Sequence, residues 1–349
     1  MKIGHVSYFG VNRSGLYEAS RDMAKSDIIA GNQVFFFDAG VPEKDGRKTI
    51  QVGAVDNRSG FKLETANPDL LNEMDLIFMH TGIDDKYLVK TNAPIIWVVH
   101  GKPLDCFRPE QDSIRDSYTL YNNLAKWKRS IYMLYFWKEY IPFWCNFPKE
   151  KKLILDYPVI DQYRFNDSDD MYQIEDKGKY NVLICDSDRA DIDKFEMIIG
   201  AIETAKKIKG IKFHFIGLDF PLKNCFKTLL DELDKVGGLG DLKPRMGDMQ
   251  KFYRAMDITF SPNRIINRVV AESLCCGTPV IQELNIHNMS DYSCYIPNPQ
   301  SVVDSFIKFV NDFDNKKIKK DSIIERSKVF NIENYNKIMD PIYKKIISW

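Results

Sequence analysis

The feature of this sequence that most constrains its fold is a regular alternation of short apolar runs with longer amphipathic stretches. In the first part of the chain, apolar runs occupy residues 2–9, 33–40, 75–80 and 94–101, and an amphipathic stretch at 16–30 separates the first two. Strand, helix and strand at this spacing indicate a parallel sheet with crossover helices. We therefore expect a protein of the α/β class.

The same rhythm returns in the second part of the chain, over residues 180–283. At 349 residues the chain is too long for one ordinary hydrophobic core. We therefore expect two doubly wound, Rossmann-like domains that face each other across a ligand-binding cleft. The predicted bounds are 1–157 for the N-terminal domain and 158–330 for the C-terminal domain, with a helix over 331–349 that packs back on the N-terminal domain.

Composition argues against several classes of protein. Lysine plus arginine and aspartate plus glutamate both number 49, so no global field attracts a polyanion or an anionic membrane. The seven cysteines are scattered, with no C-x-x-C pair, which indicates reduced thiols rather than a disulfide framework or a metal cluster. The sequence shows no signal peptide and no apolar run of membrane-spanning length. These features predict a cytoplasmic protein without a transmembrane segment and leave its oligomeric state open.

Four segments in the second part of the chain carry recognisable motifs in a fixed order. They are VIDQYRF at 159–165, CDSDRADIDKFEMIIGAI at 185–202, MGDMQKFYRAMDITFSP at 246–262 and VVAESLCCGTPVI at 269–281. In order and type these segments resemble glycosyltransferase family 4, whose members have the two-domain GT-B architecture. The resemblance implies an N-terminal acceptor domain and a C-terminal domain that binds a nucleotide sugar.

The resemblance further implies the reaction. A hexosyl or pentosyl group would move from a nucleoside-diphosphate sugar, more typically UDP- or GDP-linked, to an acceptor hydroxyl with retention of configuration. No cofactor and no metal are expected, because Arg189 and Lys194 would neutralise the charge that grows on the departing diphosphate. The DSD sequence at 186–188 has the pattern of a metal-phosphate motif but directly precedes Arg189. Arg189, Lys194 and His100 are the predicted catalytic residues.

Glu272 is the strongest candidate for nucleotide binding. Its neighbours are apolar, it comes early in a predicted helix, and the resemblance assigns it to the two ribose hydroxyls. The segment before it, with Asn267 and Arg268, is expected to hold the diphosphate at the unpaired N–H groups of the helix start. Arg264 stands where the family has a glutamate that contacts the donor sugar. The identity of that sugar therefore does not carry over.

Further candidates lie in the N-terminal part of the chain. Arg13, Ser14 and Gly15 precede the first predicted helix, where glycine lets a backbone N–H approach a ligand. An ordinary strand-to-helix turn would explain these three residues equally well. His100 ends an apolar strand, and the resemblance assigns it a contact with the donor sugar or the acceptor. Gly247, in the second part, matches the family segment near the nucleobase.

Several functions remain open on the sequence alone. The acceptor could be a small molecule, a saccharide or a lipid, or a hydroxymethylated base in DNA, as for phage enzymes with this fold. The balanced charge argues against DNA, because phosphate-driven binding depends on basic surface. A sugar-nucleotide epimerase, or a non-catalytic nucleotide-sugar-binding protein, would have the same architecture.

Overall fold

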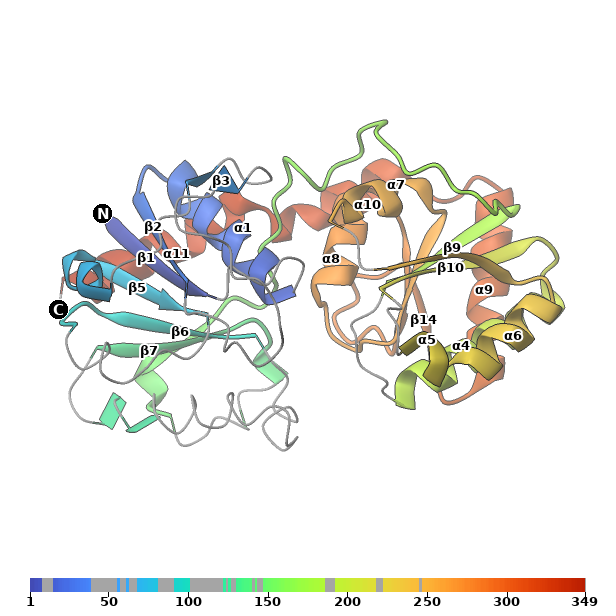
Figure 1. The fold of residues 1–349 in the computed structure, drawn as a ribbon, viewed down its shortest axis with the longest axis horizontal. Helices are drawn as coiled ribbons and strands as arrows, with labels where there is room; N and C mark the ends of the chain where they lie inside the picture. The colour runs from blue at the N-terminus through green and yellow to red at the C-terminus, as the bar shows by residue number, and fades with distance from the viewer. Residues whose placement is uncertain are drawn as a thin grey trace. The chain divides into compact units, whose positions relative to one another are not determined.

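The structure is a computed structural model of the 349-residue chain. It describes residues 1–7, 15–38, 55–56, 61–62, 68–80, 91–100, 122–123, 125–126, 130–139, 142, 147–185, 192–217, 222–244 and 247–348. The chain divides into two compact units, shown in Figure 1. Unit 1 consists of Met1–Val159 with Ile332–Trp349, and unit 2 of Ile160–Asn331.

Unit 1 is built on a six-stranded parallel sheet in the order β2-β1-β5-β6-β7-β8. The strands are β1 (Lys2–Ser7), β2 (Gln33–Asp38), β5 (Leu76–Met79), β6 (Ile95–Val99), β7 (Ile131–Tyr135) and β8 (Lys152–Ile154). Strands β5 and β6 are buried along their whole length, as expected for apolar strands covered on both faces. The apolar runs of the sequence thus form the centre of this sheet.

Helix α1 (Gly15–Ile29) follows β1 and packs beside α11 (Ile332–Ile347), which brings the last part of the described chain back to unit 1. The smaller elements of unit 1 whose bounds the described residues give include an antiparallel pair and two 3-10 helices. They are β3 (Val55–Asp56), β4 (Phe61–Lys62), η2 (Pro68–Glu73) and η6 (Lys149–Lys151).

Unit 2 is built on a second six-stranded parallel sheet, in the order β11-β10-β9-β12-β13-β14. The strands are β9 (Tyr180–Cys185), β10 (Ile211–Ile216), β11 (Leu239–Lys243), β12 (Ile258–Ser261), β13 (Val280–Glu283) and β14 (Tyr292–Cys294). Numbered within the sheet, this order is 3-2-1-4-5-6, the order of dinucleotide-binding folds. It reverses between β9 and β12, where such folds bind their ligands at the carboxyl ends of the strands.

Helices cover both faces of the unit 2 sheet (Figure 1). On one face, α4 (Ile192–Lys207), α6 (Lys227–Lys235) and α9 (Pro299–Asp314) share a hydrophobic core with the strands. The helices α7 (Met249–Ala255), α8 (Arg268–Cys275) and α10 (Lys320–Ser327) pack together on the other. The described residues of unit 2 also include two short helices, α5 (Leu222–Cys225) and η7 (Lys328–Phe330).

The α/β class and the two doubly wound sheets predicted from the sequence are confirmed. Four described strands were not predicted: β3 and β4, which form the short antiparallel pair of unit 1, and β11 and β14, which belong to the sheet of unit 2. Strand β11 has the sequence LGDLK, in which only Asp241 is buried, and β14 is three residues long. Both lie at the edges of their sheet, where a continuous apolar run is not required. Within the described ranges, no helix combines the length and apolar character needed to span a membrane.

Candidate functional site

The N-terminus of α8 lies at the carboxyl edge of the unit 2 sheet, because α8 follows β12 after a short loop. Asn267 is the N-cap of this helix, and its side-chain oxygen accepts a hydrogen bond from the backbone N–H of Val270 at 3.1 Å. A capping side chain satisfies one of the N–H groups that a helix start leaves unpaired. The side chain of Asn267 therefore holds the helix start itself.

Glu272 lies one helical turn after Arg268 and is 6% exposed. Its Oε1 accepts a hydrogen bond from Nε of Arg268 at 3.0 Å and lies 2.7 Å from Nη2 of the same guanidinium. Its Oε2 accepts a hydrogen bond from the hydroxyl of Tyr253, on α7, at 3.1 Å. A buried carboxylate is tolerated when it is paired and hydrogen-bonded in this way. The structure thus brings two predicted site residues into direct contact.

The hydroxyl of Tyr253 is a permanent donor to Glu272. Burial, followed by the nearby Cys185 and Glu272, raises the pKa of Tyr253 well above its usual range. The phenol therefore keeps its proton at neutral pH and orients the carboxylate. Sequence reasoning did not connect Tyr253 with Glu272, since they lie 19 positions apart on different helices.

Arg264, in the loop before α8, has a side chain that is 58% exposed. Its Nε and Nη2 both donate to Oε1 of Glu283, at 3.1 and 2.9 Å. Glu283 is buried and is the last residue of β13, so it lies at the carboxyl edge of the sheet. Sequence reasoning missed Glu283, although an acidic residue at the end of a buried strand was a usable signal. A neighbouring strand thus places a carboxylate beside Arg264.

The remaining candidates of unit 2 have different surroundings. The carbonyl of Gly247 accepts a hydrogen bond from the guanidinium of Arg164, whose Nε also donates to Gln250 at 3.2 Å. Lys194 is 4% exposed and lies in the first turn of α4, the helix that follows β9. Arg189 and the DSD sequence before it lie outside the described residues.

In unit 1, His100 directly follows β6 and is therefore at the carboxyl edge of that sheet. It is partly exposed, and its Nε2 lies 2.9 Å from Nδ1 of His80. Gly15 is the exposed first residue of α1, and a Cβ added there would meet no described atom within 4 Å. Arg13 and Ser14 lie outside the described residues.

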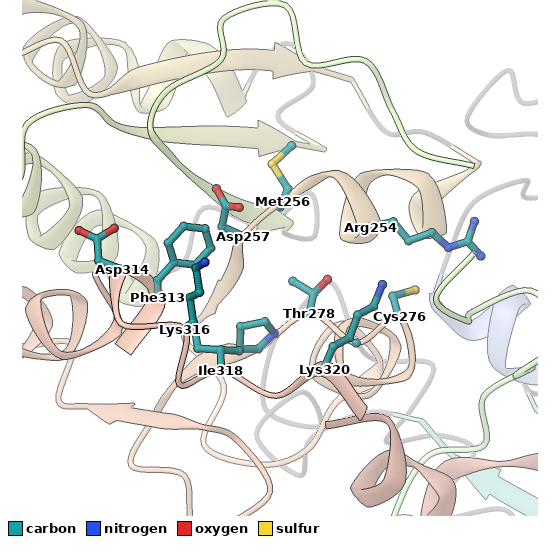
Figure 2. A pocket seen from close by; sticks show the side chains of 12 residues that line it. Arg254, Met256, Asp257, Cys276, Thr278, Phe313, Asp314, Lys316, Ile318 and Lys320 are labelled. Atoms are coloured by element: carbon teal, nitrogen blue, oxygen red, sulfur yellow. The ribbon is translucent and has the colours of Figure 1, made fainter. Parts of the chain in front are cut away.

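A cavity of about 580 Å³ lies in unit 2, and Figure 2 shows the side chains that line it, among them Asp257, Thr278 and Lys320. Asp257 precedes β12 and Thr278 precedes β13, so the cavity is at the amino ends of the strands. Its Arg254 is engaged by the carbonyls of Arg164 and Asn166. The cavity therefore lies at the opposite edge of the sheet from the start of α8. No group of three or more His, Cys, Asp or Glu side chains suited to a metal ion occurs in the described part of the chain.

Comparison with known proteins shows the fold of the whole chain. No family model matches the sequence, and no curated protein sequence matches it. Among solved structures, 99% of this chain aligns with all of Anabaena HepE in complex with UDP and glucose, at a TM-score of 0.71 and 14% identity. The pneumococcal O-GlcNAc transferase GtfA, in complex with UDP and GlcNAc, aligns over 99% of both chains at a TM-score of 0.67 and 9% identity.

A third structure is an α-glucosyltransferase in complex with UDP and a 13-mer DNA that contains an HMU base. It aligns over 100% of both chains at a TM-score of 0.64 and 10% identity. At such low identities the similarity shows the fold alone. The chain therefore has the GT-B fold predicted from its sequence.

Proposed function

We propose that this protein is a glycosyltransferase that moves a sugar from a nucleoside-diphosphate sugar to an acceptor hydroxyl. The observation that carries the proposal is the match of 99% of the chain to all of a structure bound to UDP and glucose. The four family 4-like motifs, in order along unit 2, support the same conclusion independently of the fold.

Glu272 holds the ribose of the donor nucleotide in this proposal. A carboxylate has about four lone-pair directions, and Arg268 and Tyr253 use three of them, so one on Oε2 remains to accept from a ribose hydroxyl. Its partners fix the carboxylate in advance, which lowers the entropy that binding would cost. The positive end of α8 and Arg268 support the diphosphate.

Arg189 and Lys194 stabilise the leaving diphosphate in this scheme, and His100 contacts the sugar or the acceptor. Charge on the diphosphate grows as the glycosidic bond breaks, so cations placed there favour the transition state over the ground state. Retention of configuration and independence of metal follow from the family resemblance and belong to the proposal. By the family resemblance Arg264 stands where a glutamate contacts the donor sugar, and because Arg264 is held by Glu283 we assign the two residues to donor choice.

A hydroxymethylated base in DNA is the second candidate acceptor. The observation that favours it is the full-length match to the DNA-bound α-glucosyltransferase. The equal numbers of basic and acidic residues weigh against it. A gel shift with hydroxymethylated and plain DNA over a range of salt separates the two, because phosphate-driven binding must weaken steeply as salt rises.

The central test is a thermal-shift screen over nucleoside diphosphates and their sugars, followed by incubation with each ligand that binds. A ligand at 100 times its Kd adds about 2.7 kcal/mol to the stability of the folded state. Release of nucleoside diphosphate together with a glycosylated acceptor supports transfer. An epimerised sugar would instead identify an epimerase, and binding without turnover would identify a non-catalytic binding protein.

A further inference from the structure

Unit 1 contains an unbroken series of hydrogen bonds through three histidines. Nε2 of His5 lies 2.9 Å from Oδ2 of Asp27, and Nδ1 of His5 lies 3.0 Å from Nε2 of His80. Nδ1 of His80 in turn lies 2.9 Å from Nε2 of His100. Asp27, His5 and His80 are buried, and His100 is partly exposed. We call Asp27, His5, His80 and His100 the histidine chain.

The order of strands in the sheet explains why these residues meet. His5 lies in β1, His80 follows β5, and His100 follows β6, and these three strands are neighbours. The ring of His5 stacks on Phe78 of β5, with centroids 4.8 Å apart and planes 5° from parallel. Asp27 enters from α1. The histidine chain thus runs from the buried side chain of Asp27 on α1 to the carboxyl edge of the sheet.

The hydrogen-bond partners of Asp27 set the positions of the protons. A carboxylate only accepts, so Nε2 of His5 carries a hydrogen. A neutral imidazole has one N–H, so Nδ1 of His5 accepts from Nε2–H of His80, and Nδ1 of His80 accepts from Nε2–H of His100. Nδ1 of His100 is then the ring nitrogen without a proton. Asp27 therefore determines which nitrogen of His100, three hydrogen bonds away, is basic.

Two phenols of α11 complete the surroundings of Asp27. The hydroxyl of Tyr343 donates to Oδ1 of Asp27 at 2.9 Å, so it accepts from the hydroxyl of Tyr335, 2.9 Å away. Burial, followed by the charge of Asp27, raises the pKa of both Tyr335 and Tyr343 well above their usual range. The two phenols keep their protons and act only as donors toward Asp27. Within the described chain, the side-chain partners of this carboxylate are therefore His5 and Tyr343, and neither carries a fixed positive charge.

We propose that Asp27, His5 and His80 form a proton relay that makes Nδ1 of His100 a base and moves the resulting positive charge inward to His5. The O–H bond of a bound ligand's hydroxyl breaks, its electron pair stays on the oxygen, and its proton bonds to Nδ1 of His100. The Nε2 proton of His100 moves to Nδ1 of His80, and the Nε2 proton of His80 moves to Nδ1 of His5. His5 becomes an imidazolium beside the Asp27 carboxylate, and the reverse transfers release the proton.

His80, the middle one of the three histidines, can pass a proton on but is a poor place for a lasting positive charge. Burial, followed by the charges of His100 and His5, lowers the pKa of His80 well below its usual range. Charge is instead favoured at His5, because Asp27 is its direct partner and a buried ion pair is far less costly than a buried single charge. His5, His80 and Asp27 are therefore positioning residues that act through His100.

The part of the relay in sugar transfer rests on the proposed function, whereas the proton positions do not. Selective ¹⁵N labelling of histidine tests them directly, because the protein has only five histidines. At pH ~8 we expect His5, His80 and His100 each to carry their proton on Nε2. On acidification, the first added charge on the chain should appear at His5. A proton on Nδ1 of His100 at pH ~8, or first protonation at His80, would overturn the relay.

Asp27→Asn supplies the second measurement. Asparagine can still accept a hydrogen bond from Nε2 of His5 but has no charge. The pKa at which the histidine chain takes up its first proton should therefore fall by about 1–3. Asp340→Asn, an exposed acid-to-amide change on α11, is the matched control and should leave it unchanged. A folded Asp27→Asn variant with an unaltered pKa would contradict the proposal. If this variant does not fold, Tyr343→Phe decides, because loss of a donor makes Asp27 more basic and should raise the pKa of the chain. An unchanged or lower value would then refute the relay.

The same variants separate the relay from the proposed function. If sugar transfer occurs, the acid limb of the pH profile of kcat should move with the pKa of the chain in Asp27→Asn, while KM for the nucleotide sugar stays constant. If the acid limb of the kcat profile is the same in Asp27→Asn as in the unaltered protein, the relay takes no part in sugar transfer. If no sugar nucleotide supports turnover, the proposed function fails, and the labelled histidines still decide the relay.

Discussion

The group around Glu272 and the histidine chain are both buried polar clusters, but they are assembled in different ways. Glu272 and Arg268 are four positions apart on one helix, and Tyr253 is 19 positions away. The histidine chain joins residues from 5 to 100, and Tyr343 supports it from 316 positions beyond Asp27. The first cluster holds its carboxylate with a permanent cation, whereas the second holds it with two neutral groups, of which His5 can take up a proton. The group around Glu272, which we call the local cluster, is thus suited to holding a ligand in one position. The histidine chain is suited to moving a proton.

A buried histidine of unit 2 gives the sharpest test of this difference. Nδ1 of His214 accepts from the backbone N–H of Asp241 at 3.0 Å, and its Nε2 donates to Asn181 at 3.2 Å. Neither partner accepts a relayed proton, so the folded protein should keep His214 neutral until the pH approaches about 4. Burial lowers the pKa of His214 to about 4, against an opposing effect of Asp241.

The sign of the pH effect follows from that depressed pKa. Unfolded histidine binds a proton near pH ~6.5, so stability is fully present above that value and is lost as pH falls toward about 4. The loss should reach about 3 kcal/mol as an upper value. Urea unfolding of unit 2 between these pH values measures it. His214→Gln should flatten the profile, and His287→Gln, at a partly exposed site, should not. Equal slopes in the two variants would remove His214 as the cause.

The second expected effect concerns the local cluster. Glu272→Gln removes a charged acceptor of a ribose hydroxyl, so the affinity for UDP should fall about 10- to 100-fold, equivalent to about 1.4–2.7 kcal/mol. Tyr253→Phe, which removes only one orienting donor, should cost a few-fold. Isothermal titration measures both, with Glu232→Gln on the exposed surface of α6 as the control. If Glu272→Gln binds UDP as tightly as the control, Glu272 does not bind the ribose of the nucleotide.

The smallest expected effect comes from the cap of α8. Asn267→Ala and Asn298→Ala each remove an asparagine N-cap in unit 2, from α8 and α9, and each should cost about 1 kcal/mol of stability. Only Asn267→Ala should also weaken UDP binding, by a few-fold, because only α8 is assigned to the diphosphate. Thermal unfolding and titration of the same samples separate the two effects. Equal UDP affinity in both variants would mean that the start of α8 does not contact the nucleotide.

The sequence predicts the fold well because the evidence for it is local. Apolar runs mark the interior strands of the two six-stranded sheets, whereas the edge strands β11 and β14 were not predicted, since edge strands do not need such runs. The contact of Arg268 with Glu272 follows from helical spacing. Glu283 and the histidine chain could not be found in this way, because their partners depend on which strands lie side by side. The pattern along the chain does not specify that order.

The hydrogen bond between Tyr343 and Asp27 has a consequence for biosynthesis. Asp27 emerges from the ribosome 316 residues before its phenolic partner, a delay of about 16–63 s at ~5–20 residues per second. During that time α1 has no α11 beside it, and the carboxylate of Asp27 has no phenol to accept from. Unit 2, a continuous segment, can finish folding before unit 1 does. A chain that ends at Asn331 and has been released from the ribosome should therefore contain a native unit 2 joined to an unfinished unit 1.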